Sequence, residues 1–310
     1  MANVGIQFFA IVCILSFDPA FGALFGPTPF WNDLKTTFAI DGFVPIYQGK
    51  GYNPLPRSKT VAEKQGWISA SPNCENDGQF AGFRYINAAD PTKPDTTVSP
   101  LMDRNGIIAG IQMNIKVSEA KANPNNTYKF DEIAMFYRNT IAGDDVYTLT
   151  AYFVDPSTIC SQGRTSSQFT SDGTGTQLYF QNGPDPSNLI VVPNDRTQAL
   201  TEGWSDNKCF VGMGVHNWFQ QEKFQETNCN YLRPAFLLYN VRNKLIGFGF
   251  QHVGKSVSTR VEYPPATVVK MIVGDKCSQC LLDLAAHGGI GVTTMHVFMI
   301  GSPQFQNCII

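Results

Sequence analysis

The sequence predicts an all-β protein, built from two related β-sandwich or jelly-roll-like units with few short helices. Short runs rich in β-branched and aromatic residues recur along the 310 residues and end at Gly, Pro, Asn or Asp, as strands do. The 27 glycines and 19 prolines are typical of a chain with many tight turns. No window of a dozen residues has the apolar period of 3.6 that marks an amphipathic helix.

Six runs carry the strand signal. In chain order they cover residues 107–117, 146–154, 235–239, 245–251, 267–273 and 293–300. Asn105 and Gly106 stand directly before the first run, and an Asn-Gly pair is the strongest short signal for a β-hairpin. Residues 280–286 read CLLDLAA and predict one or two helical turns, which end at Gly288 and Gly289.

A weak repeat runs through the chain. Trp67 and Trp204, each after a glycine, lie 137 residues apart, and Cys74 and Cys209 lie 135 apart. An Arg-Asn pair before a strand recurs at a similar distance. The pattern suggests an internal duplication. Chance recurrence of short apolar strings is the alternative.

The N-terminus predicts a secreted protein. Residues 5–17 form an apolar run of 13, and Ala20-Phe21-Gly22 follows with the small-x-small pattern that signal peptidase cleaves. The run is shorter than the ~20 apolar residues that span a bilayer. Residues 1–22 are therefore expected to be a signal peptide, with a buried N-terminal strand as the alternative.

The rest of the chain divides by composition. Residues 23–65 contain several prolines and predict an extended lead-in packed on the first half. A first β unit is expected at 66–160 and a second at 201–310. Between them, 161–200 begins as a polar Gly/Ser/Thr-rich loop and then predicts a short hairpin around a Pro/Asp/Gly turn.

Cysteine usage agrees with an extracellular protein. Of the eight cysteines, Cys13 would leave with the signal peptide, and an oxidising compartment predicts three disulfides and one leftover among the rest. The unpaired cysteine is expected to be either a free buried thiol or part of an intermolecular disulfide. A disulfide at Cys308 would fix the C-terminal tail to the rest of the chain. Cys277 and Cys280 lack a second Cys-x-x-Cys for a zinc site, so a structural disulfide role is expected. The seven candidates are Cys74, Cys160, Cys209, Cys229, Cys277, Cys280 and Cys308.

Asn125 begins the one N-glycosylation sequon, Asn-Asn-Thr, in an Asn/Pro-rich segment that predicts a surface loop. A glycan there would make the chain a secreted glycoprotein.

Charge excludes one class of partner. Lys and Arg number 23 against 25 Asp and Glu, so the net charge is −2 and no basic excess exists for nucleic acid. No membrane span is predicted. The chain also lacks the Gly-x-Ser-x-Gly and His-Glu-x-x-His motifs of hydrolases and metalloproteases.

Three histidines are candidate metal ligands. His216, His252 and His296 lie in or beside apolar strands, with methionines near two of them. Imidazole with a thioether suits copper, and imidazole alone also suits zinc. The alternative is three separate, half-buried histidines that each make ordinary hydrogen bonds.

Several strings resemble a family of secreted invertebrate proteins to which no reaction is assigned. The resemblance covers most of the mature chain and implies a secreted all-β protein, with no catalytic residue. The strings are Asp103–Gln112, Ala151–Pro156 before Cys160, Cys209 with Met213–His216, Leu245–His252 and Thr293–Phe298.

These features predict a secreted, disulfide-bonded glycoprotein that acts as an extracellular binding or matrix module. Its partner would be an extracellular glycan or protein, and no cofactor is expected. The alternative is a secreted enzyme that depends on copper or zinc held by the three histidines.

Overall fold

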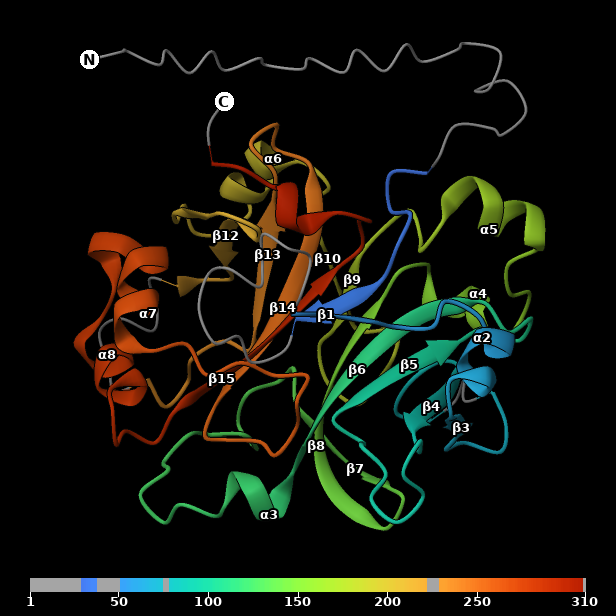
Figure 1. The fold of residues 1–310 in the computed structure, drawn as a ribbon, viewed down its shortest axis with the longest axis horizontal. Coiled ribbons are helices and arrows are strands. Elements are labelled where there is room, and N and C mark those ends of the chain that lie inside the picture. Colours follow the sequence, from blue (N-terminus) through green and yellow to red (C-terminus); the bar gives the residue numbers. More distant parts are fainter. Residues whose placement is uncertain (1–28, 38–50, 75–77, 222–228, 309–310) are drawn as a thin grey trace, which may run out of the picture.

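The computed structural model describes residues 29–37, 51–74, 78–221 and 229–308 (Figure 1). Two antiparallel sheets, one of seven strands and one of eight, form the framework of this part of the chain, together with few short helices. The predicted all-β fold is therefore confirmed. The expected signal peptide, residues 1–22, lies outside the described residues.

The eight-stranded sheet is built mainly from the first predicted unit. Its order is β10-β9-β8-β6-β5-β4-β3, and β7 pairs with β8 outside this path. Its strands are β3 (Trp67–Ser69), β4 (Phe83–Asn87), β5 (Val98–Met102), β6 (Ile108–Lys116), β7 (Tyr137–Ile141), β8 (Asp144–Tyr152), β9 (Tyr179–Gln181) and β10 (Leu189–Val191).

The seven-stranded sheet is built mainly from the second unit. Its order is β11-β12-β13-β14-β15-β1-β2. Its strands are β1 (Lys35–Thr37), β2 (Tyr52–Pro54), β11 (Cys209–Phe210), β12 (Gly214–Trp218), β13 (Ala235–Tyr239), β14 (Leu245–Val253) and β15 (Val292–Phe298).

Nine short helical segments connect or cover these strands in the described part of the chain. The α-helices are α2 (Lys59–Lys64), α3 (Val117–Ala120), α4 (Pro156–Ile159), α5 (Ser166–Asp172), α6 (Arg196–Thr201), α7 (Ala266–Val273) and α8 (Gln279–Ala285), and the 3₁₀ turns are η2 (Gly274–Lys276) and η3 (Pro303–Phe305). The helix expected at 280–286 corresponds to α8.

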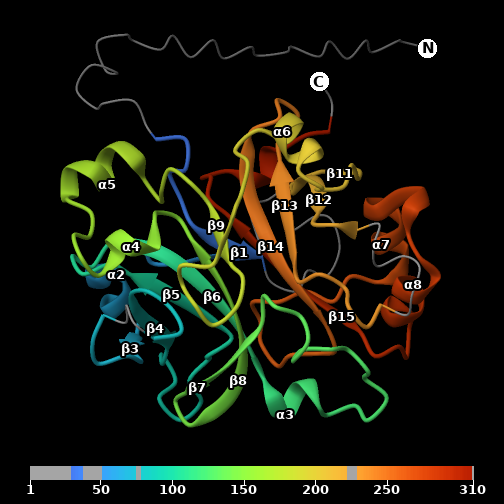
Figure 2. The same cartoon turned by 180° about the vertical axis from the view of Figure 1, so that it is seen from behind.

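The strand predicted at 267–273 is wrong, because these residues form α7. Pro265 caps the helix with an extended backbone, and Val269, Ile272 and Val273 are buried one helical turn apart. This stripe packs on the outer face of the seven-stranded sheet, against residues such as Phe236. Figures 1 and 2 show α7 and α8 side by side at that edge of the molecule. Tertiary burial has overridden the β propensity of valine and isoleucine.

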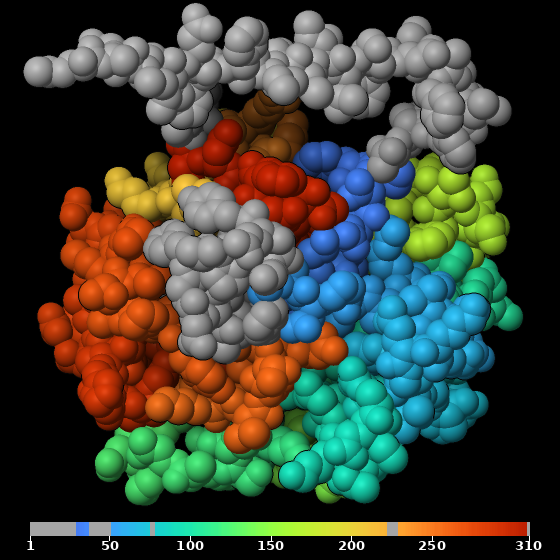
Figure 3. Space-filling model, viewed as in Figure 1, coloured from blue at the N-terminus to red at the C-terminus, as the bar shows by residue number. Residues whose placement is uncertain are grey.

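The lead-in contacts both halves, as far as it is described: Ile108 N donates to Arg57 O at 3.0 Å on the first half, while its two strands join the other sheet. β1 pairs antiparallel with β15, and β2 pairs with β1. Leu34 and Leu55 at the ends of this hairpin are buried in the main core cluster. Figure 3 shows these segments, in blue, between the orange second half and the cyan first half.

The hairpin expected within 161–200 is formed by β9 and β10. It joins the eight-stranded sheet through β8, where Phe180 pairs with Ala151. Each sheet therefore receives a hairpin from outside the predicted unit that supplies most of its strands. The β1–β2 hairpin joins the seven-stranded sheet, and the β9–β10 hairpin joins the eight-stranded sheet. The two predicted units consequently share one core rather than closing separately.

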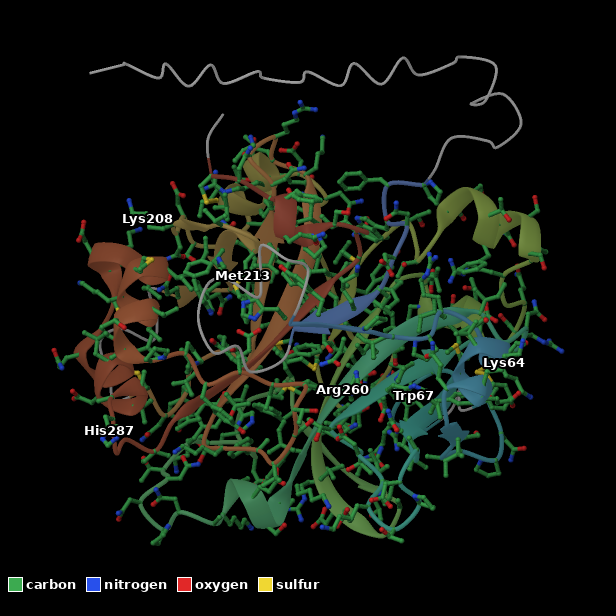
Figure 4. The ribbon with its side chains drawn as sticks, in the orientation of Figure 1. Lys64, Trp67, Lys208, Met213, Arg260 and His287 are labelled. Carbon is green, nitrogen blue, oxygen red and sulfur yellow. A yellow bond between two sulfur atoms is a disulfide. The ribbon has the colours of Figure 1, made fainter. Side chains whose placement is uncertain are left out.

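Aromatic rings of both sheets form this shared core. Phe248 on β14 lies 5.5 Å from Phe180 on β9 and 6.3 Å from Phe153, measured between ring centroids. The Arg260 guanidinium lies 5.2 Å from the Trp67 ring, and both residues are labelled in Figure 4. Contacts between sequence-distant segments thus hold the sheets together.

The 137-residue spacing recurs in the structure. The bounds of α2 and α6, of β5 and β13, and of β6 and β14 each differ by 137. The turns match as well, because Asp103 N donates to Ile107 O at 2.7 Å and Asn240 N donates to Lys244 O at 2.9 Å. An internal duplication stays a prediction that these correspondences motivate.

Three disulfides join distant segments: Cys74–Cys160, Cys209–Cys308 and Cys229–Cys280. Cys277 is a free, half-buried thiol. The expected number of disulfides is therefore confirmed within the described residues. The Cys308 bridge does tie the C-terminal segment to β11.

Candidate functional site

A pocket lies between the outer face of the seven-stranded sheet and the helix pair α7–α8. We call it the histidine pocket and define it by five polar residues, His216, Gln251, Glu262, Thr294 and His296, within apolar walls. Its cavity volume is ≈ 60 Å³. The walls include Phe210, Met213, Trp218, Phe236, Val268 and Ile272.

Strand register brings the two histidines together. His216 on β12 pairs with Leu238, and His296 on β15 pairs with Gly249, so both side chains project from the same face of the sheet. Their Nε2 atoms lie 3.3 Å apart, and the exposed fractions of the residues are 1% for His216 and 4% for His296.

Phe236 and Gly249 shape the space around this pair. A Cβ atom at Gly249 would come within 2.0 Å of the Phe236 ring, so a glycine is needed for the ring to lie over β14. The ring centroid then lies 5.7 Å from that of His216 and 5.0 Å from that of His296. The aromatic ring excludes water from one side of both imidazoles.

Glu262 completes the polar group from an irregular segment. Its backbone bridges Thr294 through two hydrogen bonds of 2.8 and 3.0 Å. This bridge places Glu262 Oε2 at 3.2 Å from His296 Nδ1. Glu262 Oε1 and Thr294 Oγ1 are buried and have no hydrogen-bond partner among the described residues. The pocket therefore holds polar atoms with unused bonding capacity.

Burial controls the charge of His216. Desolvation holds the pKa of His216 well below its usual value, the nearby His296 lowers it further, and the carbonyls of Gly214 and Lys208 act in the opposite direction. His216 is therefore neutral at neutral pH, with one ring nitrogen that carries a proton and one that can accept a hydrogen bond.

His252 lies on the opposite face of β14 from this pocket. His252 pairs with Thr293, which lies three residues from His296 on the same strand. Side chains alternate between the two faces of a strand, so the His252 ring projects from the face opposite to that of His296. Its Nε2 is 3.2 Å from Ser256 Oγ and its Nδ1 is 3.2 Å from Val253 O. His216, His252 and His296 therefore do not converge on one point, as the three-histidine metal site would require. The described residues contain no group of three or more metal-capable side chains of His, Cys, Asp or Glu.

Met213, labelled in Figure 4, supplies a thioether to the wall of the pocket, while His287 lies at the exposed outer end of α8. Glu262 was not predicted from the sequence. Its segment, VEYPP, has no metal or catalytic spacing, and only its bridge to β15 brings it to His296.

A second, open site lies at the other end of the molecule, between α4 and the β9–β10 turn. We call it the Asp-Pro-Ser groove, because Asp155-Pro156-Ser157 and Asp185-Pro186-Ser187 both line it. Its volume is ≈ 610 Å³. It is ten times larger than the histidine pocket and falls within the roughly 300–1,000 Å³ of organic-ligand sites.

The two turns of the groove have the same hydrogen bonding. Asp155 Oδ1 accepts from Ser157 N at 2.9 Å and from its Oγ at 2.7 Å. Asp185 Oδ1 accepts from Ser187 N and Oγ, both at 2.8 Å. Both bonds lower the pKa of Asp185 and keep it ionised, and the bond from the Ser187 backbone has the larger effect. Each carboxylate is thus held in one orientation, and its exposed side stays available to accept hydrogen bonds from a ligand.

Asn125, the predicted glycosylation site, is exposed in the loop that follows α3. Its backbone N donates to Asn123 Oδ1 at 2.9 Å, and the side chain of Thr127 donates to Asn230 Oδ1 at 2.7 Å. The loop is ordered by these bonds, and a glycan on Asn125 would extend into solvent.

Comparison with known proteins finds no matching protein family, no matching curated protein and no matching solved structure. In the part of the chain that the structure describes, none of the helices has the length and apolar character needed to cross a bilayer.

Proposed function

We propose that this chain is a secreted, disulfide-bonded glycoprotein that acts as an extracellular binding module, and that the Asp-Pro-Ser groove is where it binds a glycan. The observation that carries the proposal is the pair of matched turns, with Asp155 and Asp185 presenting oriented carboxylates to one groove. Sugar hydroxyls donate hydrogen bonds, and a charged acceptor strengthens such a bond about two-fold.

The compartment supports this proposal. Disulfides persist in oxidising, extracellular environments, and three are present here. The Cys74–Cys160 disulfide belongs to the small apolar cluster that also contains Ala81 and Ile159, next to the groove. This bridge would keep the wall of the groove rigid, which lowers the entropy cost of binding.

Size separates the groove from the histidine pocket. A cavity of ≈ 60 Å³ cannot admit a sugar ring, whereas ≈ 610 Å³ can. Trp218 and Phe219 do not form an exposed stacking platform, because Trp218 packs on His216 and Phe219 packs on Trp204. Recognition would therefore depend on hydrogen bonds rather than on ring stacking.

The alternative of a metal-dependent enzyme that uses three histidines is not proposed further. His252 faces away from His216 and His296, so the required ligand set does not form.

The test is binding of the purified, secreted protein to immobilised chitin, cellulose and heparin. We expect retention on a neutral glycan and at least a ten-fold loss of affinity in the double variant Asp155→Asn, Asp185→Asn, since each charge-assisted hydrogen bond contributes about 1.5–3 kcal/mol. Asparagine preserves the turn-forming acceptor and removes the charge.

Asp195→Asn is the matched control. Asp195 is a half-buried helix cap whose side chain likewise accepts from a backbone N two residues on, Thr197 N at 2.9 Å, but it lies outside the groove. Absence of binding to every glycan, or equal loss in the control, would contradict the proposal.

A further inference from the structure

We propose that the histidine pocket binds a small primary alkylammonium ion, with Glu262 and Thr294 as its hydrogen-bond acceptors. The first argument is that the fold buries these acceptors without partners. Glu262 Oε1 and Thr294 Oγ1 are buried and make no hydrogen bond with any described residue. Leaving a buried polar atom unpaired is costly, so a ligand that donates a hydrogen bond to each of them would remove that cost.

Both acceptors lie on the pocket side of the sheet. Thr294 is two residues from His296 on β15, so the two side chains project from the same face. Thr294 has an exposed fraction of only 7% and lines the pocket. Two backbone hydrogen bonds of 2.8 and 3.0 Å hold Glu262 beside it. A single amino group in the pocket would therefore have both oxygens within its surroundings.

The histidines leave this bonding capacity unused. His216 Nε2 and His296 Nε2 lie 3.3 Å apart and contact each other. His296 Nδ1 lies 3.2 Å from Glu262 Oε2, yet it makes no hydrogen bond with a described residue. Glu262 therefore needs a donor from outside the chain that the structure describes.

The charges of the lining select the class of ligand. Among the described residues that line the pocket, Glu262 is the one acidic side chain, and none is a lysine or an arginine. Burial lowers the pKa of His216, which is neutral at neutral pH. An ammonium group brings the charge opposite to that of Glu262, and a charge-assisted hydrogen bond is about twice as strong as a neutral one. The lining thus favours a cationic donor over an alcohol or an anion.

The size and walls of the cavity limit the rest of the ligand. A volume of ≈ 60 Å³ holds about four to six water-sized groups, which fits an ammonium nitrogen with about one to three carbons. Met213, Val268 and Ile272 supply apolar surface for the alkyl chain. The rings of Trp218 and Phe236 also line the pocket, and aromatic faces attract cations.

The experiment is titration of the purified, full-length protein with methyl-, ethyl- and propylammonium chloride, followed by the ¹³C NMR signals of the methionine methyl groups. Met213, labelled in Figure 4, lines the pocket, whereas Met271 on α7 has an exposed fraction of 54% and lies outside the lining. We expect the Met213 signal to shift and the Met271 signal to stay in place. The dissociation constant for propylammonium should be about 0.1–10 mM, as its few atoms allow. Affinity should rise about four-fold with each added methylene.

Two further probes test the chemistry on the unchanged protein. 1-Propanol has nearly the shape of propylammonium without its charge, and tetramethylammonium has the charge without an N–H donor. Each should bind at least ten-fold more weakly than propylammonium, because each lacks one half of the charge-assisted hydrogen bond.

Matched variants identify the site. Glu262→Gln keeps the size of the side chain, removes its charge and should weaken propylammonium binding at least ten-fold. Glu202→Gln changes an exposed glutamate at the end of α6 and should bind as the unchanged protein does. The double variant Asp155→Asn, Asp185→Asn should also be unaltered, which separates this site from the carboxylates of the Asp-Pro-Ser groove.

Several results would overturn the assignment. These are a Met213 signal that none of the three alkylammonium ions shifts, and equal affinity for propylammonium and 1-propanol. Unaltered affinity in a folded Glu262→Gln variant, or an equal loss in Glu202→Gln, would also overturn it. Tighter binding of tetramethylammonium than of propylammonium would show that Glu262 and Thr294 do not act as acceptors for the ligand.

Discussion

At the scale of single residues, the two sheets carry different side chains at matching positions. Arg84 pairs with Leu101 on the eight-stranded sheet, and His216 pairs with Leu238 on the other. The two leucines are 137 residues apart, so Arg84 is the counterpart of His216. A buried cation in one half thus corresponds to a buried neutral imidazole in the other.

The neighbouring positions explain why only one half has this pocket in the described structure. Gln112 is the counterpart of Gly249, and Thr150, opposite Gln112, is the counterpart of His296. Gln112 fills the space with its own side chain and donates to Thr150 Oγ1 at 3.1 Å. Gly249 leaves that space to the Phe236 ring and the two imidazoles.

His252 makes the stability of the fold dependent on pH. Burial lowers its pKa to about 4, against about 6.5 in an unfolded chain. The unfolded chain therefore takes up a proton first, so this contribution to stability is complete above pH ~6.5 and is lost as the pH falls towards 4. The full loss corresponds to about 3 kcal/mol.

Urea unfolding across this pH range checks the prediction. His252→Gln should flatten the decrease in unfolding free energy between pH 6.5 and 4. His287→Gln, which removes an exposed histidine, should leave the slope as it is. A slope that is identical in the His252→Gln variant and the unchanged protein would contradict the prediction.

At the scale of elements, α7 shows how local composition and tertiary burial compete. Its sequence, ATVVKMIV, is rich in the residues that favour strands. In the structure it covers the outer face of the seven-stranded sheet and forms a wall of the histidine pocket. An apolar stripe needs a second surface for burial, and the sheet provides it.

Two neighbouring residues of α7 test this packing. Ile272 is buried and contacts the sheet cluster, whereas Met271 has an exposed fraction of 54%. Ile272→Ala should lower the free energy of unfolding by about 2–5 kcal/mol, because it leaves a cavity. Met271→Ala should change it by less than about 0.5 kcal/mol. Equal effects in urea unfolding would show that α7 does not pack in this way.

At the scale of the whole molecule, hairpins from outside the two units hold the halves together, and each disulfide closes a loop within one half. The Cys209–Cys308 bridge secures the C-terminal segment to an edge strand. Cys209→Ser with Cys308→Ser should cost about 2–5 kcal/mol of unfolding free energy. Cys277→Ser, which removes the free thiol, is the control and should have a small effect.

Peptide mapping under non-reducing conditions measures the connectivity directly. The expected result is three intramolecular bridges, with Cys277 available to an alkylating reagent. A dimer linked through Cys277, or a different pairing, would contradict this arrangement.

The sequence by itself determined the all-β class, most of the long strands and the number of disulfides. The strands at 107–117 and 235–239, for example, correspond closely to β6 and β13. Alternation, β-branched composition and turn residues are local properties, so they can be read without knowing what lies opposite. The sequence also identified His216 and His296, because a histidine within an apolar strand stands out.

Only the tertiary structure decided which histidines meet. The position of His252 on the other face, the approach of Glu262 and the pairing of β1 with β15 all depend on strand register between segments far apart in sequence. Register is set by packing across the whole sheet, and shifting it by one residue moves every side chain to the opposite face. That information lies in long-range contacts, which no local pattern of residues contains.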